Sequence, residues 1–331
     1  MKIAVLGSKN FDSLEYHIVD SFKHLQHEVF HIDISDITNF GYKYSYWIQK
    51  LSLKLDEKIF TKIAYKIIEQ SPDLVVCTYR NINPITIKLI KQHLKNIPVV
   101  HLNPDAVTTF GDQQIFSSPY DIYFTKDTFI VDFMKNKMGL NTMYLPEAFN
   151  HRIHKPPAIN NRLEHEKQVA SDVVAFGTMY PYRSNVINNL IRANINVDLY
   201  GTSDKKFPNF EIQRRFKNEY ITGARKSEVL YGAKIVFNNF HYAEVNCVNV
   251  KFFEIMGTGA FQICDYKSCI EEYSNIPPEQ FTFKNYQQAV DLIKFYLDKP
   301  ELRHEIANKQ LNYFLENHTY DIRMQQLLNL L

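Results

Sequence analysis

Short apolar runs alternate with segments of helical periodicity along the whole chain, a pattern typical of parallel α/β folds. In the first half, six such runs are each followed by a polar turn, and helical patterns separate most of them. We therefore predict a Rossmann-like domain of β/α units over residues 1–150. The strands are expected at 2–6, 27–34, 72–79, 97–102, 120–125 and 141–145, and the helices at 13–25, 42–69 (long or broken), 84–94 and 127–137.

The same alternation restarts after a break. Residues 151–170 lose the strand pattern and carry Pro and charge, which is typical of a linker. A second Rossmann-like domain is expected at 171–305, with strands near 172–177, 196–201, 234–240 and 260–264. Residues 306–331 form a charged, apolar-periodic tail, expected to be helical and to pack back on the N-terminal domain.

The composition excludes some classes of protein but does not identify a function. The 331 residues are 45% hydrophobic and 22% charged, as in ordinary globular proteins, and exceed the length at which a single core keeps growing. The net charge of +2 gives no general case for a nucleic-acid partner. No signal peptide or membrane span is visible, so we expect a cytoplasmic protein. The four cysteines have no C-x-x-C spacing, and we expect reduced thiols and no zinc.

The stretch 249–264 is the most informative part of the chain, because a short helix pattern passes through two glycines into an apolar strand. Asn249 lies at the helix start, where backbone N–H groups attract anions, and Lys251 and Glu254 share one face. A phosphate beside Lys251 and a ribose beside Glu254 would make a nucleotide site. The alternative is a surface ion pair of Lys251 with Glu254, whose position the helix dipole also favours.

Polar residues also follow several predicted strands, where open parallel sheets bind ligands. Arg80, His101, Asn103 and Asp105 follow or end two strands of the first half, although Asn-Pro-Asp is also ordinary turn chemistry. Arg183 lies just inside a helix that begins with Pro and is a second possible phosphate contact, or a surface residue. The first strand-to-helix turn lacks the G-x-G-x-x-G fingerprint, which disfavours a nicotinamide enzyme.

Two other groups of residues are candidates for a binding site. His151 and His154 have a spacing that could share a metal, but no Cys or carboxylate stands nearby in the sequence, and we predict no metal. The aromatic residues at 42, 44, 46 and 47 could form an acceptor site, or a patch facing a partner or the membrane surface.

Several motifs resemble those of GT-B glycosyltransferases, and specifically the CgeB-like spore-maturation-protein family of bacterial glycosyltransferases. The resemblance covers most of the chain and is most specific at 249–261. The N-terminal half matches more loosely, at Asp105 and at Tyr144-Leu-Pro-x-Ala-Phe-Asn150, which leads to His154-Lys-Pro156. In the C-terminal half the matching segments are Ala175-Phe-Gly-x-x-Tyr-x-x-Arg183, Val197-Asp-Leu-Tyr-Gly201, the Gly223 loop, Ala233-Lys-Ile-Val-Phe-Asn238, Asn249-x-Lys-x-Phe-Glu254-x-x-Gly-x-Gly-Ala-Phe261 and His318-Thr-Tyr-x-x-Arg323.

This resemblance implies a GT-B fold of two Rossmann-like domains facing a cleft, with the nucleotide-sugar donor on the C-terminal domain and the acceptor on the other. Glu254 would bind the ribose and the loop from Gly223 to Arg225 the base. Other implied donor contacts are Asn249, Val250 and Lys251 at the pyrophosphate, and Gly177, Tyr180 and Arg183 at the phosphates or the sugar. The acceptor side would include Arg80, Asn103 and Glu147.

The sequence departs from the family in one respect. The second acid that retaining enzymes carry eight residues before the ribose acid is replaced by Asn246, and Glu244 lies two residues earlier. The resemblance implies a metal-independent hexosyltransferase-like enzyme acting on a glycan, lipid or protein. If it inverts, Asp105 is the first candidate base and His101 the second. Retention and inversion both remain open, and the alternative function is a non-catalytic nucleotide-sugar or glycan-binding protein.

Overall fold

The computed structural model describes residues 1–38, 52–106 and 114–331, which divide into two compact units. The first unit contains 1–146 and 320–331, and the second contains 147–319. The expected domain boundary at 150 therefore lies close to the observed division. The tail is shared between the units, because helix α14 (Pro300–Asn317) belongs to the second and the last helix, α15 (Tyr320–Asn329), to the first. The aromatic patch at 42–47 falls outside the described residues.

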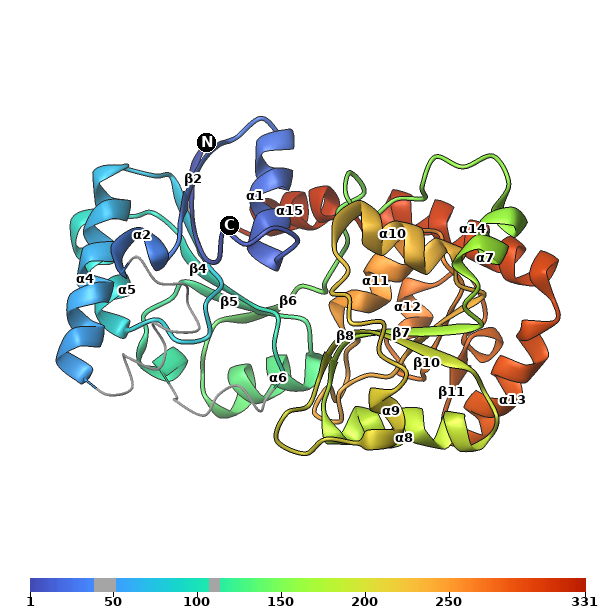
Figure 1. Cartoon of the computed structure of the whole chain (residues 1–331). Coiled ribbons are helices and arrows are strands. Elements are labelled where there is room, and N and C mark those ends of the chain that lie inside the picture. The colour runs from blue at the N-terminus through green and yellow to red at the C-terminus, as the bar shows by residue number, and fades with distance from the viewer. Residues whose placement is uncertain (39–51, 107–113) are drawn as a thin grey trace. The chain divides into compact units, whose positions relative to one another are not determined.

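The first unit is built on one parallel sheet in the order β2-β1-β3-β4-β5-β6 (Figure 1). Each of its strands coincides with a predicted apolar run, because a strand buried on both faces needs a nearly continuous run of apolar residues. The strands are β1 Lys2–Leu6, β2 Glu28–Ile32, β3 Leu74–Cys77, β4 Val99–Asn103, β5 Ile122–Thr125 and β6 Thr142–Tyr144.

Helices cover both faces of this sheet. Ala4 and Leu6 point into a cluster with α4 and α5, and Ile3 and Val5 point into a cluster that includes residues of α1 and α15, as the two-residue period of a strand requires. The helical segments are α1 Leu14–His24, α2 Ser35–Thr38, α4 Leu53–Glu69, α5 Pro84–His93, the 3₁₀ turn η2 Gln114–Ser117, α6 Thr128–Asp132, the π-helical turn η3 Phe133–Lys137 and α15 Tyr320–Asn329.

The second unit has a parallel sheet in the order β11-β10-β9-β7-β8 (Figure 1). Residues of α10 and α11 pack with β7 and β9 in one cluster, and α13 contacts α8, β9 and β10. The strands are β7 Val173–Met179, β8 Val197–Ser203, β9 Ile235–Asn238, β10 Gln262–Asp265 and β11 Thr282–Phe283. The helical segments are α7 Arg162–Val169, α8 Pro181–Arg192, α9 Phe210–Gln213, α10 Gly223–Gly232, α11 Val250–Gly257, α12 Ile270–Tyr273, η4 Pro278–Gln280, α13 Tyr286–Leu297 and α14 Pro300–Asn317.

Two details of the second unit differ from the sequence prediction. The segment predicted as a linker contains helix α7, which Asn161 caps by accepting a hydrogen bond from Glu164 N. Gly223, predicted to lie in a loop, is the first residue of α10 and has a φ of +53°, a value that favours glycine.

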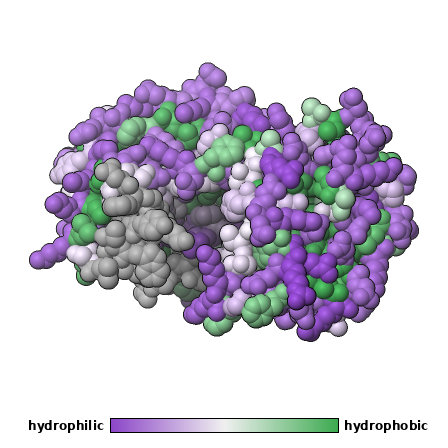
Figure 2. Space-filling model, viewed as in Figure 1, coloured by the Kyte–Doolittle hydropathy of each residue, from purple (hydrophilic) through white to green (hydrophobic). Residues whose placement is uncertain are grey.

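Surface and core divide as expected for a globular chain. The face shown in Figure 2 is mostly hydrophilic, with apolar residues scattered over it. Within the described ranges, no helix is both long enough and apolar enough to cross a membrane. All four cysteines are buried free thiols.

Candidate active site

The carboxyl end of β7 is the centre of the candidate site. Gly177 on β7 pairs with Gly201 on β8, and their φ angles are +103° and +113°, a region that side chains rarely adopt. A Cβ on Gly201 would lie 2.5 Å from the carbonyl oxygen of Gly177. A Cβ on Gly177 would lie 3.3 Å from Nζ of Lys251 and 3.4 Å from Nη1 of Arg183. Gly177 therefore leaves the end of β7 without a side chain at the point where Lys251 and Arg183 approach it.

Arg183 is a buried cation with one unmet donor. It lies in the first turn of α8, which begins at Pro181, and only 5% of its surface is exposed. Its Nη1 donates to the carbonyl oxygen of Phe176 at 2.7 Å, and its Nε donates to Oδ1 of Asn239 at 3.0 Å. Among the described residues, Nη2 has no hydrogen-bond partner. Burial lowers the pKa of Arg183 to about 10, so it is still a cation at neutral pH.

Lys251 brings a second cation to the same carbonyl group. Its Nζ donates to the carbonyl oxygen of Phe176 at 3.3 Å. Burial lowers the pKa of Lys251 well below its usual range, the charge of Arg183 lowers it further, and Glu244 and Glu254 act in the opposite direction. Burial and the charge of Arg183 both disfavour the charged form of Lys251, so an anion bound beside the two side chains would stabilise it.

The N-terminus of α11 adds backbone donors beside Lys251. Asn249 caps the helix by accepting from Phe252 N at 3.1 Å, and its amide exchanges two 3.0 Å hydrogen bonds with Asn238 of β9. The Val250 and Lys251 N–H groups belong to the same first turn, where helix geometry provides no intrahelical acceptor. Asn249 is thus a positioning residue for the helix start, and the predicted contact of Val250 with phosphate would be through its backbone.

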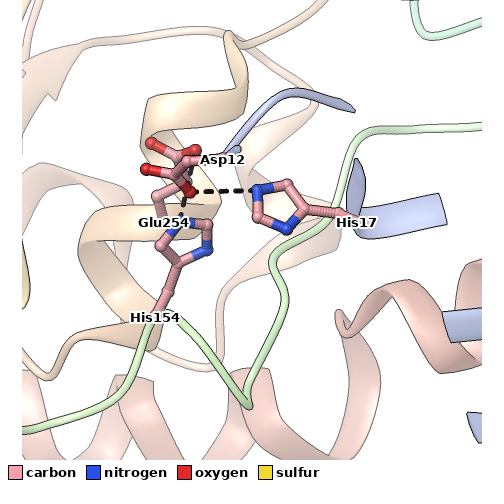
Figure 3. A group of neighbouring side chains, drawn as sticks. All are labelled: Asp12, His17, His154 and Glu254. Carbon is pink, nitrogen blue, oxygen red and sulfur yellow. Dashed lines mark ion pairs between the residues drawn. The ribbon is translucent and has the colours of Figure 1, made fainter. Parts of the chain in front are cut away.

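Glu254, the expected ribose acid, lies in a buried charged cluster. Its Oε2 is 3.2 Å from Nζ of Lys226 on α10, and its Oε1 is 3.6 Å from Nε2 of His154 (Figure 3). Lys226 Nζ is also 3.2 Å from Nε2 of His154. From the sequence, His154 was expected only as a possible metal ligand and as part of the looser family resemblance, and no role was predicted for Lys226.

Two further acids influence the cations. Glu244 accepts a hydrogen bond from His241 N at 2.7 Å, and its charge raises the pKa of both Arg183 and Lys251. Burial raises the pKa of Asp265, at the end of β10, to about 6, and its charge also acts on Arg183. Glu244 is therefore an acid whose charge acts on both cations. Its position in the sequence, two residues before Asn246, was the available signal.

The other predicted donor contacts have different surroundings. Tyr180 precedes α8 and is exposed, with its ring 6.3 Å from that of His241. Arg225 is exposed on α10 and pairs with Glu219, Nε to Oε1, at 2.7 Å, which raises the pKa of Arg225. A contact of Arg225 with the base would have to compete with this ion pair.

In the first unit, the two candidate bases differ in environment. Both oxygens of the Asp105 carboxylate accept from Arg80, Nη2 to Oδ1 at 2.7 Å, and Asn103 hydrogen-bonds the Asp105 backbone. His101 is buried, stacks on Tyr123 with ring centroids 5.0 Å apart, and has its pKa lowered to about 4 by burial. An imidazole with such a low pKa is a weak base at neutral pH, which weakens the case for His101 as the general base.

One more residue was expected on the acceptor side, and the first unit holds one further pair of ionisable side chains. Glu147, predicted to be there, is buried and is the first residue of the second unit. The first unit also contains an acid–imidazole pair that the sequence analysis missed, Asp12 Oδ1 to His17 Nε2 at 3.1 Å (Figure 3). The left-handed φ of +63° at Asp12 is costly for a residue with a side chain, and local spacing gave no sign of it.

Comparison with known proteins gives this arrangement a family context. Residues 183–329 match the model of a family described as glycosyl transferase-like. They carry the sequence pattern of a glycosyltransferase. This match confirms the expected enzyme class, a glycosyltransferase of EC class 2.4. No curated protein sequence matches the chain significantly.

Solved structures resemble the glycosyltransferase over nearly its whole length. Sucrose-phosphate synthase from Thermosynechococcus elongatus has a TM-score of 0.69 at 11% identity, with 99% of this chain and 98% of that one covered. HepE from Anabaena, solved with UDP and glucose, has a TM-score of 0.64 at 13% identity with the same coverage. The β-glucosyltransferase of phage T4 has a TM-score of 0.59 at 14% identity, again with the same coverage. The GT-B fold class predicted from the sequence is confirmed.

Proposed function

We propose that this glycosyltransferase transfers a sugar from a nucleotide-diphosphate sugar to a hydroxyl group of a glycan, lipid or protein, without a metal ion. The observation that carries the proposal is the pair of buried cations, Arg183 and Lys251, on either side of the side-chain-free position at Gly177. Arg183 Nη2 is a buried donor without an acceptor in the described part of the chain, which costs free energy until a ligand supplies one. A diphosphate oxygen is an acceptor of the right charge.

The proposed mechanism depends on where negative charge develops during the sugar transfer. The acceptor oxygen forms a bond to the anomeric carbon as the bond from that carbon to the phosphate oxygen breaks, and the diphosphate leaves with an extra negative charge. Arg183, Lys251 and the first N–H groups of α11 are fixed in the folded chain, so they can stabilise that charge with little reorganisation. They would do what a Mg²⁺ ion does in metal-dependent transferases. The hydroxyl proton passes to a base if the reaction inverts, and Asp105 is our candidate.

The donor that we would test first is a uridine diphosphate sugar. One structure with a similar fold was solved with UDP and glucose, and another was solved with UDP-glucose. On our chain the ribose would bind at Glu254 and the base near Gly223 and Arg225, in line with the family resemblance. The motifs at 175–183, 249–261 and 318–323 also lead us to propose membership of the CgeB-like branch.

The test is isothermal titration of a panel of nucleoside diphosphates and nucleotide sugars into wild type, Glu254→Ala and Lys251→Met. A charge-assisted hydrogen bond contributes about 1.5–3 kcal/mol, so Lys251→Met should weaken the preferred nucleotide by about 10- to 150-fold. Lys309→Met is the matched control, because Lys309 pairs with Glu305 on the exposed side of α14. It should leave nucleotide affinity unchanged.

Three results would change the proposal. Binding to no member of the panel would refute the donor site. Binding without release of nucleoside diphosphate, whatever acceptor is offered, would favour the non-catalytic alternative. Loss of turnover in EDTA that added Mg²⁺ or Mn²⁺ restores would refute metal independence.

A further inference from the structure

A groove of about 520 Å³ runs along α8 on the second unit, and the diphosphate site does not use it. One side is a stripe of α8 side chains, Ser184, Asn185, Asn188 and Arg192, which the helical repeat places on one face. The other side comes from the segment around α9, with Phe207 and Phe210. Its volume is within the range of ~300–1,000 Å³ that is usual for small-molecule sites.

One residue that lines the groove has a buried amide oxygen without a donor among the described residues. Asn188 lines the groove but is only 6% exposed, and its Oδ1 accepts no hydrogen bond from any residue that the structure describes. A buried acceptor left without a donor costs about 1–3 kcal/mol. A ligand that brings hydroxyl or N–H donors to this wall would remove that cost. The neighbouring Ser184 hydroxyl already donates to the carbonyl oxygen of Met179, at 3.2 Å.

The opposite wall presents aromatic rings to solvent. Phe207 is 59% exposed and Phe210 is 74% exposed, and both line the groove. Large apolar rings so exposed beside a row of amides are typical of a binding surface, because burying a ring face is favourable and the amides fix orientation. The charged residues of the groove, Arg192 and Glu211, are one of each sign, so its lining favours neither an anion nor a cation.

We propose that this groove, the α8 groove, binds a neutral oligosaccharide and that this saccharide is part of the acceptor in the transfer reaction. Sugar rings combine hydroxyl donors for Asn185 and Asn188 with C–H faces that pack on Phe207 and Phe210. The second half of the proposal rests on the proposed function. It is supported by the position of α8, whose first turn carries Arg183 while the groove continues along the helix to Arg192.

The first experiment is saturation-transfer NMR with maltotriose, cellotriose and triacetylchitotriose, each titrated against wild type without nucleotide. At least one should bind, and Phe210→Ala should weaken it about tenfold, as expected for loss of a packed aromatic ring. Asn188→Leu has nearly the same shape and removes the unmet acceptor, so it should weaken the saccharide while thermal stability is kept or raised. Tyr286→Ala, at a ring that is also exposed but lies outside the groove, is the control and should bind as wild type does.

Binding of no trisaccharide to wild type, or wild-type affinity in both groove variants, would overturn the proposal. The same samples are titrated with the preferred nucleotide, which separates this failure from failure of the donor site. If nucleotide binds and saccharide does not, the groove assignment is wrong and the proposed function stands. If saccharide binds and nucleotide does not, the groove is a saccharide site but its role in an acceptor is refuted.

Discussion

The buried contact of Lys226 with Glu254 permits a quantitative test of how Glu254, the proposed ribose acid, is positioned. Both side chains are almost completely buried, and Nζ and Oε2 are 3.2 Å apart. Coulomb's law at an effective dielectric constant of ~20 gives an attraction of about 5 kcal/mol at that distance. Desolvation offsets much of it, but removing only one member of a buried ion pair typically costs about 3–5 kcal/mol. We expect that loss for Lys226→Met.

The double variant Lys226→Met/Glu254→Gln should recover a large part of this loss, because the carboxylate that lost its partner is gone as well. The chain has two units, and unfolding of the whole molecule need not be a single transition. Hydrogen exchange in peptides from α10 and α11 therefore serves as the assay, since it reports the opening free energy of these helices directly. A coupling energy below about 0.5 kcal/mol between the two substitutions would refute the ion-pair interpretation.

Three further predictions concern single positions. Gly177→Ala should weaken nucleotide binding about tenfold, because its Cβ would crowd two cations at a strained φ; titration with affinity equal to wild type would contradict this. Gly257→Ala should lower stability by ~1–3 kcal/mol, because its Cβ would lie 2.1 Å from Cδ2 of Phe149; an unchanged melting temperature would show that the ring moves freely. The folded-state pKa of Asp265, raised from 3.8 to about 6, means that its ionisation destabilises the fold as pH rises across that interval. Asp265→Asn should therefore gain melting temperature relative to wild type between pH 4 and pH 7, whereas a difference independent of pH would refute the assignment.

Local sequence was sufficient for the architecture and for the centre of the site. Parallel strands buried on both faces must be apolar, so the runs around 2–6 and 173–179 were visible without any tertiary information. The helix that carries Lys251 and Glu254 was also predictable, because Asn249 is a good N-cap and Gly257 and Gly259 end the helical pattern. Helix capping and hydrophobic periodicity depend only on residues that are close together in the sequence, so a single sequence is enough to recognise them.

The partners of the site residues were not predictable, because burial and long-range contact decide them. Arg183 could equally have been a surface residue, and only the folded sheet shows its guanidinium buried against the Phe176 carbonyl. Lys226 and His154 meet Glu254 from segments far away in the sequence, and neither has a neighbour that indicates this contact. Asn188 looked like any polar residue on a helix surface.

The electrostatics of the second unit explain why a chain would keep such costly groups. Arg183 and Lys251 both donate to one carbonyl oxygen, where burial disfavours both charges and the charge of Arg183 further disfavours that of Lys251, and the nearby Glu244 offsets this only in part. The same features make the site a strong one for a dianion, because buried cations that are fixed in advance need not be ordered or stripped of water when the ligand arrives. In the proposed function, the free energy that the fold loses at these two side chains would be recovered in binding, and most of all when the leaving diphosphate carries its full charge.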